Sequence, residues 1–136
     1  MALILAPLLA APLGMGQTSV SDRIVATVPF AFTTAQTTLP AGEWTIVRLI
    51  TESGPSRWAI RNRTGEYRLL LVGQPVYRQL TKRTTLEFNC YEGHCFLSRI
   101  WMTGELGVYF PPARAERNLL MAGAKPRQNV LFARMR

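Results

Sequence analysis

From Arg23 onward, apolar and polar residues alternate with a period of two, and turn-forming residues recur at the spacing expected of short antiparallel strands. Successive side chains of a strand point to opposite faces, so this alternation predicts strands that bury one face. The clearest alternation lies in the segments 84–91 and 95–103. In the first segment, one face carries the apolar residues Leu86, Phe88 and Cys90. The other face carries Thr85, Glu87 and Asn89, and the pattern therefore predicts a half-buried hairpin.

The same pattern predicts further strands at residues 23–33, 43–50, 57–63, 67–72 and 76–80. Pro29 places the first of these at a sheet edge or at a bulge, because proline cannot donate a hydrogen bond to a ladder. The turn residues 73–75 (Gly-Gln-Pro) are expected to interrupt the chain before the last of them. Alternating positions on these strands predict the core: Val28, Phe30, Phe32, Trp44, Ile46, Trp58, Ile60, Leu69, Leu71, Leu86, Phe88, Leu97 and Trp101.

A change of period after the two prolines at 111–112 predicts one short helix that ends near Gly123. Its apolar residues, such as Ala113 and Leu120, are expected to cover the sheet. Its charged residues are expected to stay in water: Arg114, Glu116 and Arg117. The predicted fold class is mainly β, a single antiparallel β-sandwich or partly open barrel with one short C-terminal helix.

Residues 1–16 carry no charged side chain, and this apolar run is too short to span a bilayer as a helix. It fits the core of a signal peptide, with Gly14 and Gly16 forming a small-x-small cleavage site before Gln17. The alternative is a buried N-terminal strand or helix. We expect export to the periplasm or the cell exterior, with no stable membrane span after cleavage.

Two segments follow the signal-like one. Residues 17–123 form the predicted β domain with its helix. Residues 124–136 carry four positive charges and no negative ones, and we expect a loose basic tail, although its Val-Leu-Phe could pair as a strand.

Cys90 and Cys95 flank a four-residue loop, so they lie opposite each other in a hairpin. Facing positions are close enough for a disulfide, and export supplies an oxidising compartment. The alternative is a metal site of Cys90, Cys95 and His94, but three ligands on one tight turn with no second cluster make an incomplete zinc site. We therefore predict a structural disulfide, no bound metal and no cofactor.

Sixteen Lys and Arg residues against eight Asp and Glu give a formal net charge of +8, which favours acidic partners. An anionic polymer of the cell envelope is one such partner, and the face expected to bind it carries Arg57, Arg61 and Arg63. Further basic residues lie on neighbouring predicted strands or turns: Arg48, Arg68, Arg78, Lys82 and Arg83. With Trp44, Trp58 and Tyr67 nearby in sequence, a stacking surface for single-stranded nucleic acid is a second interpretation. A plain solvated face opposite the core is the third. Because Trp58 falls on the opposite parity to the arginines, the solvated face is favoured and nucleic acid is disfavoured.

Five glutamates leave a hydrolase of envelope sugars with paired carboxylates formally open: Glu43, Glu66, Glu87, Glu92 and Glu105. Each lies in a turn or on the outward parity of a strand, where exposure to solvent is usual. The sequence contains no GxSxG, no HExxH and no glycine-rich phosphate loop. An enzyme is therefore the least supported class, and no residue is assigned as catalytic.

Five phrases of the sequence are shared with one family: VPFAF at 28–32, TLPAGEW at 38–44, IRNR at 60–63, FLSRIW at 96–101 and ARAER at 113–117. In these phrases the chain resembles a family of small exported proteins of unassigned function from acidobacteria. The resemblance covers roughly residues 25–117 and implies an exported β-rich domain without an assigned activity. The expected function is that of an exported, non-catalytic binding or structural domain of the cell envelope.

Overall fold

The structure is a computed structural model that describes residues 20–49, 56–66 and 68–135. Within these residues the chain forms one helix and eleven strands. In chain order the elements are β1 (Val20–Val28), β2 (Phe32–Thr34), β3 (Thr37–Leu39), β4 (Gly42–Leu49), β5 (Ser56–Asn62), β6 (Arg68–Thr81), β7 (Thr85–Tyr91), β8 (His94–Trp101), β9 (Gly104–Tyr109), α1 (Arg114–Met121), β10 (Arg127–Phe132) and β11 (Arg134–Met135). The predicted signal segment, residues 1–16, lies outside the described residues.

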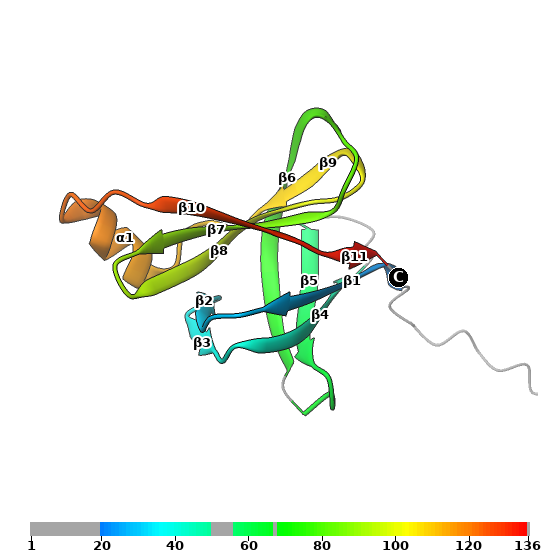
Figure 1. Cartoon of the computed structure of the whole chain (residues 1–136), viewed down its shortest axis with the longest axis horizontal. Coiled ribbons are helices and arrows are strands. Elements are labelled where there is room, and N and C mark those ends of the chain that lie inside the picture. Colours follow the sequence, from blue (N-terminus) through cyan, green and yellow to red (C-terminus); the bar gives the residue numbers. More distant parts are fainter. Residues whose placement is uncertain (1–19, 50–55, 67, 136) are drawn as a thin grey trace, which may run out of the picture.

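The strands pair in the order β10-β7-β8-β9-β6-β5-β4-β1-β11, with β2 and β3 attached beside β8. Figure 1 shows two layers: β1, β4 and β5 form the first layer, and β7, β8, β9 and β10 form the second. The two ends of this order, β10 and β11, do not pair with each other, so strand pairing does not close the sheet. Ala133 joins these two strands along the chain. The predicted fold class, an open sandwich or partly open barrel with one short helix, is confirmed.

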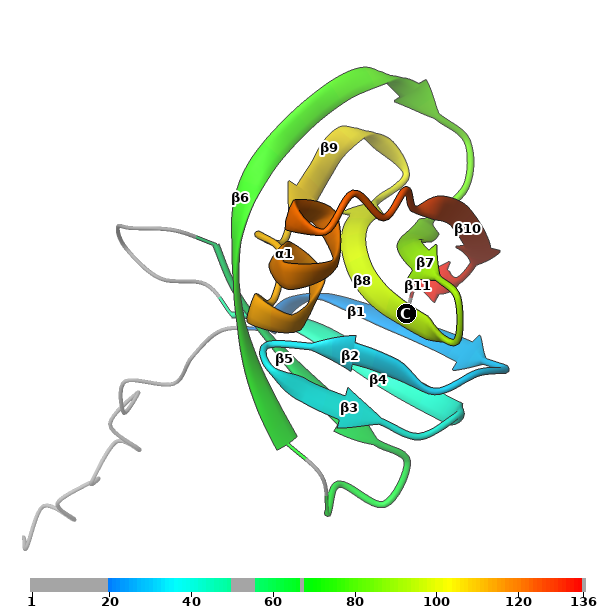
Figure 2. The ribbon, with the colours of Figure 1, turned by 90° about the vertical axis from the view of Figure 1, so that its left-hand side faces the viewer.

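Strand β6 connects the two layers and changes partner at Gly73. It pairs with β5 up to this residue and with β9 from Gln74 onward, and Figure 2 shows it as one long curved strand. A Cβ added to Gly73 would overlap the Cγ2 atom of Val108. The expected interruption at 73–75 is therefore wrong, because glycine lets the strand cross between the layers without a break.

The core lies between the layers and contains almost all of the predicted residues, with Phe30 and Leu69 only partly buried. Phe88 is central, since the rings of Phe30 and Phe32 meet it edge-on with centroids 5.1 and 5.4 Å away. The prediction omitted further buried members of this core: Ile24, Ala26, Leu39, Ile100, Met102, Val108 and Phe110.

A bulge in β8 moves Trp101 to the other face of the second layer. Glu87 pairs with Arg99, whereas Phe88 pairs with Leu97, which leaves Ser98 as the extra residue. One extra residue reverses the parity beyond it. Ile100 therefore fills the core position, and Trp101, although buried, hydrogen-bonds to Glu87 on the opposite face.

The hairpin of β7 and β8 is buried on both faces, so the prediction of a half-buried hairpin is wrong. Ala113 and Leu119 pack on Tyr91 and Phe96, and Figure 1 shows α1 beside the ends of β7 and β8. Glu87, expected in solvent, is 9% exposed, and Glu116 on α1, also expected in solvent, is 3% exposed. The expected packing of Leu120 is also wrong, since Leu120 is exposed and Leu119 takes its place.

The tail is ordered, which corrects the expectation of a loose basic terminus. Residues of β10 pair with β7 from Arg127–Cys90 to Phe132–Thr85, and β11 pairs with β1. Leu131 and Ala133 pack against the main core, and this burial explains why the tail pairs as a strand. Over residues 20–49, 56–66 and 68–135, no helix has the length and apolar character needed to cross a membrane.

Candidate anion-binding pocket

Three arginines gather on the outward face of the first layer. Thr45 of β4 pairs with Arg61 of β5, and directly opposed residues project to the same face. Their neighbours along the strands, Trp44 and Ile60, point into the core. Arg23 lies on the outward parity of β1, because Ile24 is a core residue. Pairing of β1 with β4 and of β4 with β5 therefore brings Arg23 and Arg61 to one face of the layer.

These side chains line a pocket of about 520 Å³, called here the arginine pocket. Its lining residues are Arg23, Glu43, Thr45, Arg61, Asn62, Arg63, Thr64 and Gly65. Its charged side chains are three arginines and one glutamate, which leaves an excess of positive charge. The Nε–H of Arg23 is buried and has no hydrogen-bond partner among the described residues.

A tight turn after β5 carries Arg63 to the pocket. The backbone N–H of Gly65 donates to the carbonyl of Asn62 at 3.1 Å, and Gly65 has a φ of 76°, which favours glycine. The hydroxyl of Thr64 donates to Oδ1 of Asn62 at 3.3 Å. These contacts hold the turn that follows Arg61, so the guanidinium groups of Arg61 and Arg63 share one pocket.

Guanidinium groups suit a bound anion because each offers five donors in a planar fork and no acceptor. Carboxylate, phosphate and sulfate groups fit that fork with two parallel hydrogen bonds. The nearby hydroxyls of Thr45 and Thr64 and the amide of Asn62 add groups that can bond to sugar hydroxyls. The pocket is therefore equipped to hold an anionic group with polar surroundings.

The chain was compared with protein-family models, with curated proteins and with solved structures. No match was found in any of the three. The resemblance of the five sequence phrases to the acidobacterial family stays a prediction, and the function is argued from the geometry.

Two of the three arginines that were predicted to share one binding face line the pocket. Arg61 and Arg63 line the pocket, whereas Arg57 is exposed on the same strand but does not line it. The sequence prediction missed Arg23 and Glu43, since they come from β1 and β4. Residue parity places Arg23 on the outward face, but only the order of the strands brings it beside Arg61.

Two of the three aromatic residues considered for stacking are buried, and the third, Tyr67, lies outside the described residues. Trp44 and Trp58 are core members, and the indole Nε1–H of Trp44 donates to the carbonyl of Pro40 at 3.0 Å. A binding face for single-stranded nucleic acid needs exposed rings on which bases stack. These two indoles do not provide it.

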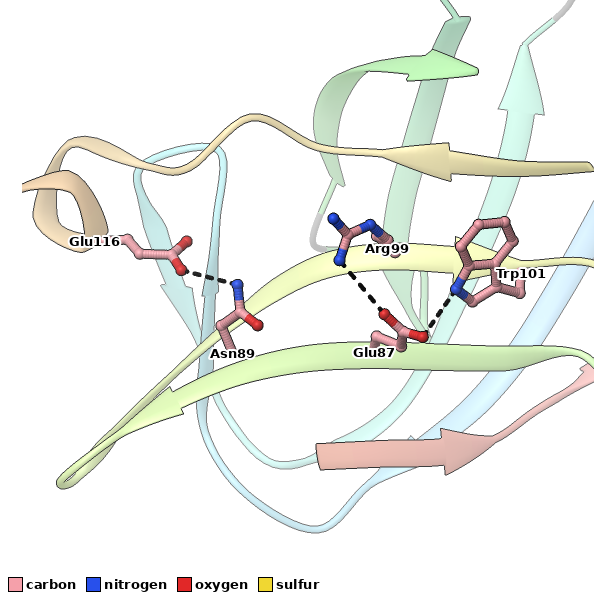
Figure 3. A network of polar contacts seen from close by, with 5 residues as sticks. All are labelled: Glu87, Asn89, Arg99, Trp101 and Glu116. Atoms are coloured by element: carbon pink, nitrogen blue, oxygen red, sulfur yellow. Dashed lines mark hydrogen bonds and ion pairs between the residues drawn. The ribbon is translucent and has the colours of Figure 1, made fainter. Parts of the chain in front are cut away.

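Two buried glutamates are shown in Figure 3: Glu87 on β7 of the second layer, and Glu116 on α1, which packs against that layer. Glu87 accepts a hydrogen bond from Nε1 of Trp101 at 2.9 Å and forms an ion pair with Arg99 at 3.6 Å. Glu116 accepts a hydrogen bond from the amide of Asn89 at 3.1 Å, which Figure 3 shows. It accepts a second one from the hydroxyl of Tyr91 at 2.8 Å. Figure 3 shows each carboxylate directed at its own donors, an arrangement that holds α1 and β8 in place.

The Tyr91 hydroxyl is strongly affected by this network. Burial, the hydrogen bond to Glu116 and the negative charge of that carboxylate raise the pKa of Tyr91 well above its usual value. The phenol therefore stays protonated and keeps donating to Glu116 far into the alkaline range.

Cys90 and Cys95 form a disulfide, as predicted, and pair directly across the β7–β8 hairpin. The turn between the strands is shorter than expected, since Tyr91 and His94 also pair, and Gly93 takes a φ of 80°. The disulfide removes both thiolates as metal ligands. Among the described residues, no group of three or more His, Cys, Asp or Glu side chains is placed to hold a metal ion.

Proposed function

We propose that the protein is an exported, non-catalytic binding domain that holds an acidic group of an envelope polymer in the arginine pocket. The observation that carries this proposal is that Arg23, Arg61 and Arg63 line one pocket of about 520 Å³, in which Glu43 is the one carboxylate among the described lining residues. The buried Nε–H of Arg23, which has no acceptor in the part of the chain that the structure describes, adds to it, because an unsatisfied buried donor gains from a ligand acceptor. An acidic sugar or a phosphate in such a polymer supplies the acceptors.

Export is the second part of the proposal. A disulfide is typical of proteins in oxidising compartments, and residues 1–16 have the composition of a signal-peptide core. Mass spectrometry of the mature N-terminus from fractionated cells tests it. A peptide beginning at Gln17 in the periplasm or the medium is expected, and an intact Met1 peptide in the cytoplasm contradicts it.

The binding part is tested by titrating the protein with polygalacturonate as the acidic polymer, at low and at physiological ionic strength. We expect Arg61→Gln and Arg63→Gln each to weaken binding about tenfold, since a hydrogen bond to a charged group contributes about 1.5–3 kcal/mol. Raising the salt concentration should weaken binding of the wild type.

Arg57→Gln is the matched control, because it removes the same charge from the same strand outside the pocket. Its affinity should stay within about twofold of the wild type, as expected for an exposed charge. An equal loss in all three variants would mean that net charge alone attracts the polymer, and the pocket would have no role. Binding of an oligothymidylate in preference to polygalacturonate would favour the nucleic acid interpretation instead.

A further inference from the structure

A second pocket lies between the two layers and takes its walls from both of them. Its volume is about 260 Å³, and we call it the inter-layer pocket. Its lining residues are Arg48, Trp58, Pro75, Tyr77, Met102, Gly107 and Val108. It shares none of these residues with the arginine pocket.

Arg48 is the charged residue of this lining and lies on the core side of its strand. It pairs with Trp58 across β4 and β5, so the two side chains project to the same face. Trp58 is a core residue that is 1% exposed. The sequence prediction placed Arg48 beside the arginine face of Arg57, Arg61 and Arg63, whereas its pairing with Trp58 puts its side chain on the core side of β4.

Trp58 also carries an unsatisfied donor. Its indole Nε1–H is buried without a hydrogen-bond partner among the described residues. The other two indoles are satisfied, since Trp44 donates to Pro40 and Trp101 donates to Glu87. A buried donor without a partner costs about 1–3 kcal/mol, so an acceptor that reaches it is favoured.

The chemistry of the lining defines the ligand. A guanidinium and an indole N–H can only donate, so the ligand has to bring an acceptor, and the charge of Arg48 favours a negative one. The remaining walls include the apolar side chains of Met102 and Val108, which are almost fully buried. The volume lies just below the ~300–1,000 Å³ of ordinary ligand pockets, so the ligand is small.

We infer that the inter-layer pocket binds a small apolar carboxylic acid, with its carboxylate toward Arg48 and Trp58 and its apolar part against Met102 and Val108. Tyr77 also lines the pocket and is 69% exposed. The carboxylate gives the indole N–H an acceptor, and the ligand enters between the layers, where β6 crosses from one to the other.

The test uses sodium hexanoate as the probe and 1-hexanol as its neutral match, with NMR of the three indole N–H signals as the readout. Trp58→Phe assigns the Trp58 signal. We expect hexanoate to shift this signal saturably while the signals of Trp44 and Trp101 stay in place. Hexanol should bind at least about tenfold more weakly, because it lacks the charge-assisted hydrogen bond. An unmoved Trp58 signal, or equal affinity for hexanol, overturns the inference.

Variants show whether hexanoate binds in the inter-layer pocket or in the arginine pocket. Arg48→Met keeps the apolar stem and should weaken hexanoate binding about tenfold while leaving hexanol binding unchanged. Arg57→Met is its control and should bind hexanoate as the wild type does. Unmoved Trp44 and Trp101 signals show that each variant is folded. If Arg61→Gln abolishes hexanoate binding, the acid is held in the arginine pocket and the inference is wrong.

Discussion

Buried polar residues fix how α1 sits on the second layer. Glu116 is the buried residue of the helix, and it accepts hydrogen bonds from Tyr91 and Asn89 of β7. The first helical N–H, that of Arg114, donates to the side chain of Gln36 in the β2–β3 turn at 3.0 Å. Hydrophobic alternation gives no signal for these contacts, because a glutamate on a short helix is ordinarily solvated. They depend on which strand face the helix covers.

Stability in alkali should depend on Tyr91. An unfolded chain releases a tyrosine proton above about pH 10, whereas the folded protein keeps it because the pKa of Tyr91 is raised. The contribution of this phenol is therefore complete below pH 10 and declines as the pH rises further. Urea unfolding at several pH values from 8 to above 10 measures the decline.

Tyr91→Phe supplies the control for this measurement. It should cost about 1–2 kcal/mol at pH 8, since it removes one donor from a buried carboxylate. The difference in stability between wild type and variant should shrink above pH 10. A difference that stays constant through this range would show that the Tyr91 proton is not linked to folding.

Among the elements, β6 contains two residues, Gly73 and Pro75, that predict a turn but lie within a strand. Gly73 and Pro75 are typical of a loop, yet both lie inside one strand that changes partners between them. The existence of the strands and most of the core were predictable, because alternation depends on neighbours in the sequence. The bulge at Ser98 and the crossing at Gly73 were not, because they depend on contacts with residues far along the chain.

Gly73→Ala should destabilise the protein by about 1–3 kcal/mol, since the added methyl group would overlap Val108 in a packed core. Thermal and urea unfolding measure the loss. The double variant Gly73→Ala with Val108→Ala removes the overlapping Cγ2 atom and should lose less stability than the sum of the two single variants. Additive losses would mean that the overlap with Val108 does not explain the need for glycine.

The whole molecule is a partly open barrel whose two sheet ends meet at its C-terminal segment. The arginine pocket depends on the fold of the whole molecule, because Arg23 and Arg61 are far apart in sequence and meet only through the pairing of β1, β4 and β5. The sequence predicted Arg61 and Arg63 from parity on one strand. Arg57 obeys the same parity, and no local property of the sequence separates it from them.

Deleting residues 127–136 should lower the unfolding free energy by at least about 2 kcal/mol, because it removes Leu131 from the core and leaves β7 with a free edge. The midpoint of urea unfolding measures the effect. A shorter deletion, of residues 134–136, keeps β10 and should cost less. Equal midpoints for the long deletion and the intact chain would restore the interpretation of these residues as a loose tail.

The position of β10 and β11 after all the other strands has a consequence for biosynthesis. β7 and β1 cannot gain these partners until residues 127–135 have been made, so each strand keeps one edge without its partner up to that point. Until then, unpaired backbone N–H and C=O groups along both strands can pair with another chain.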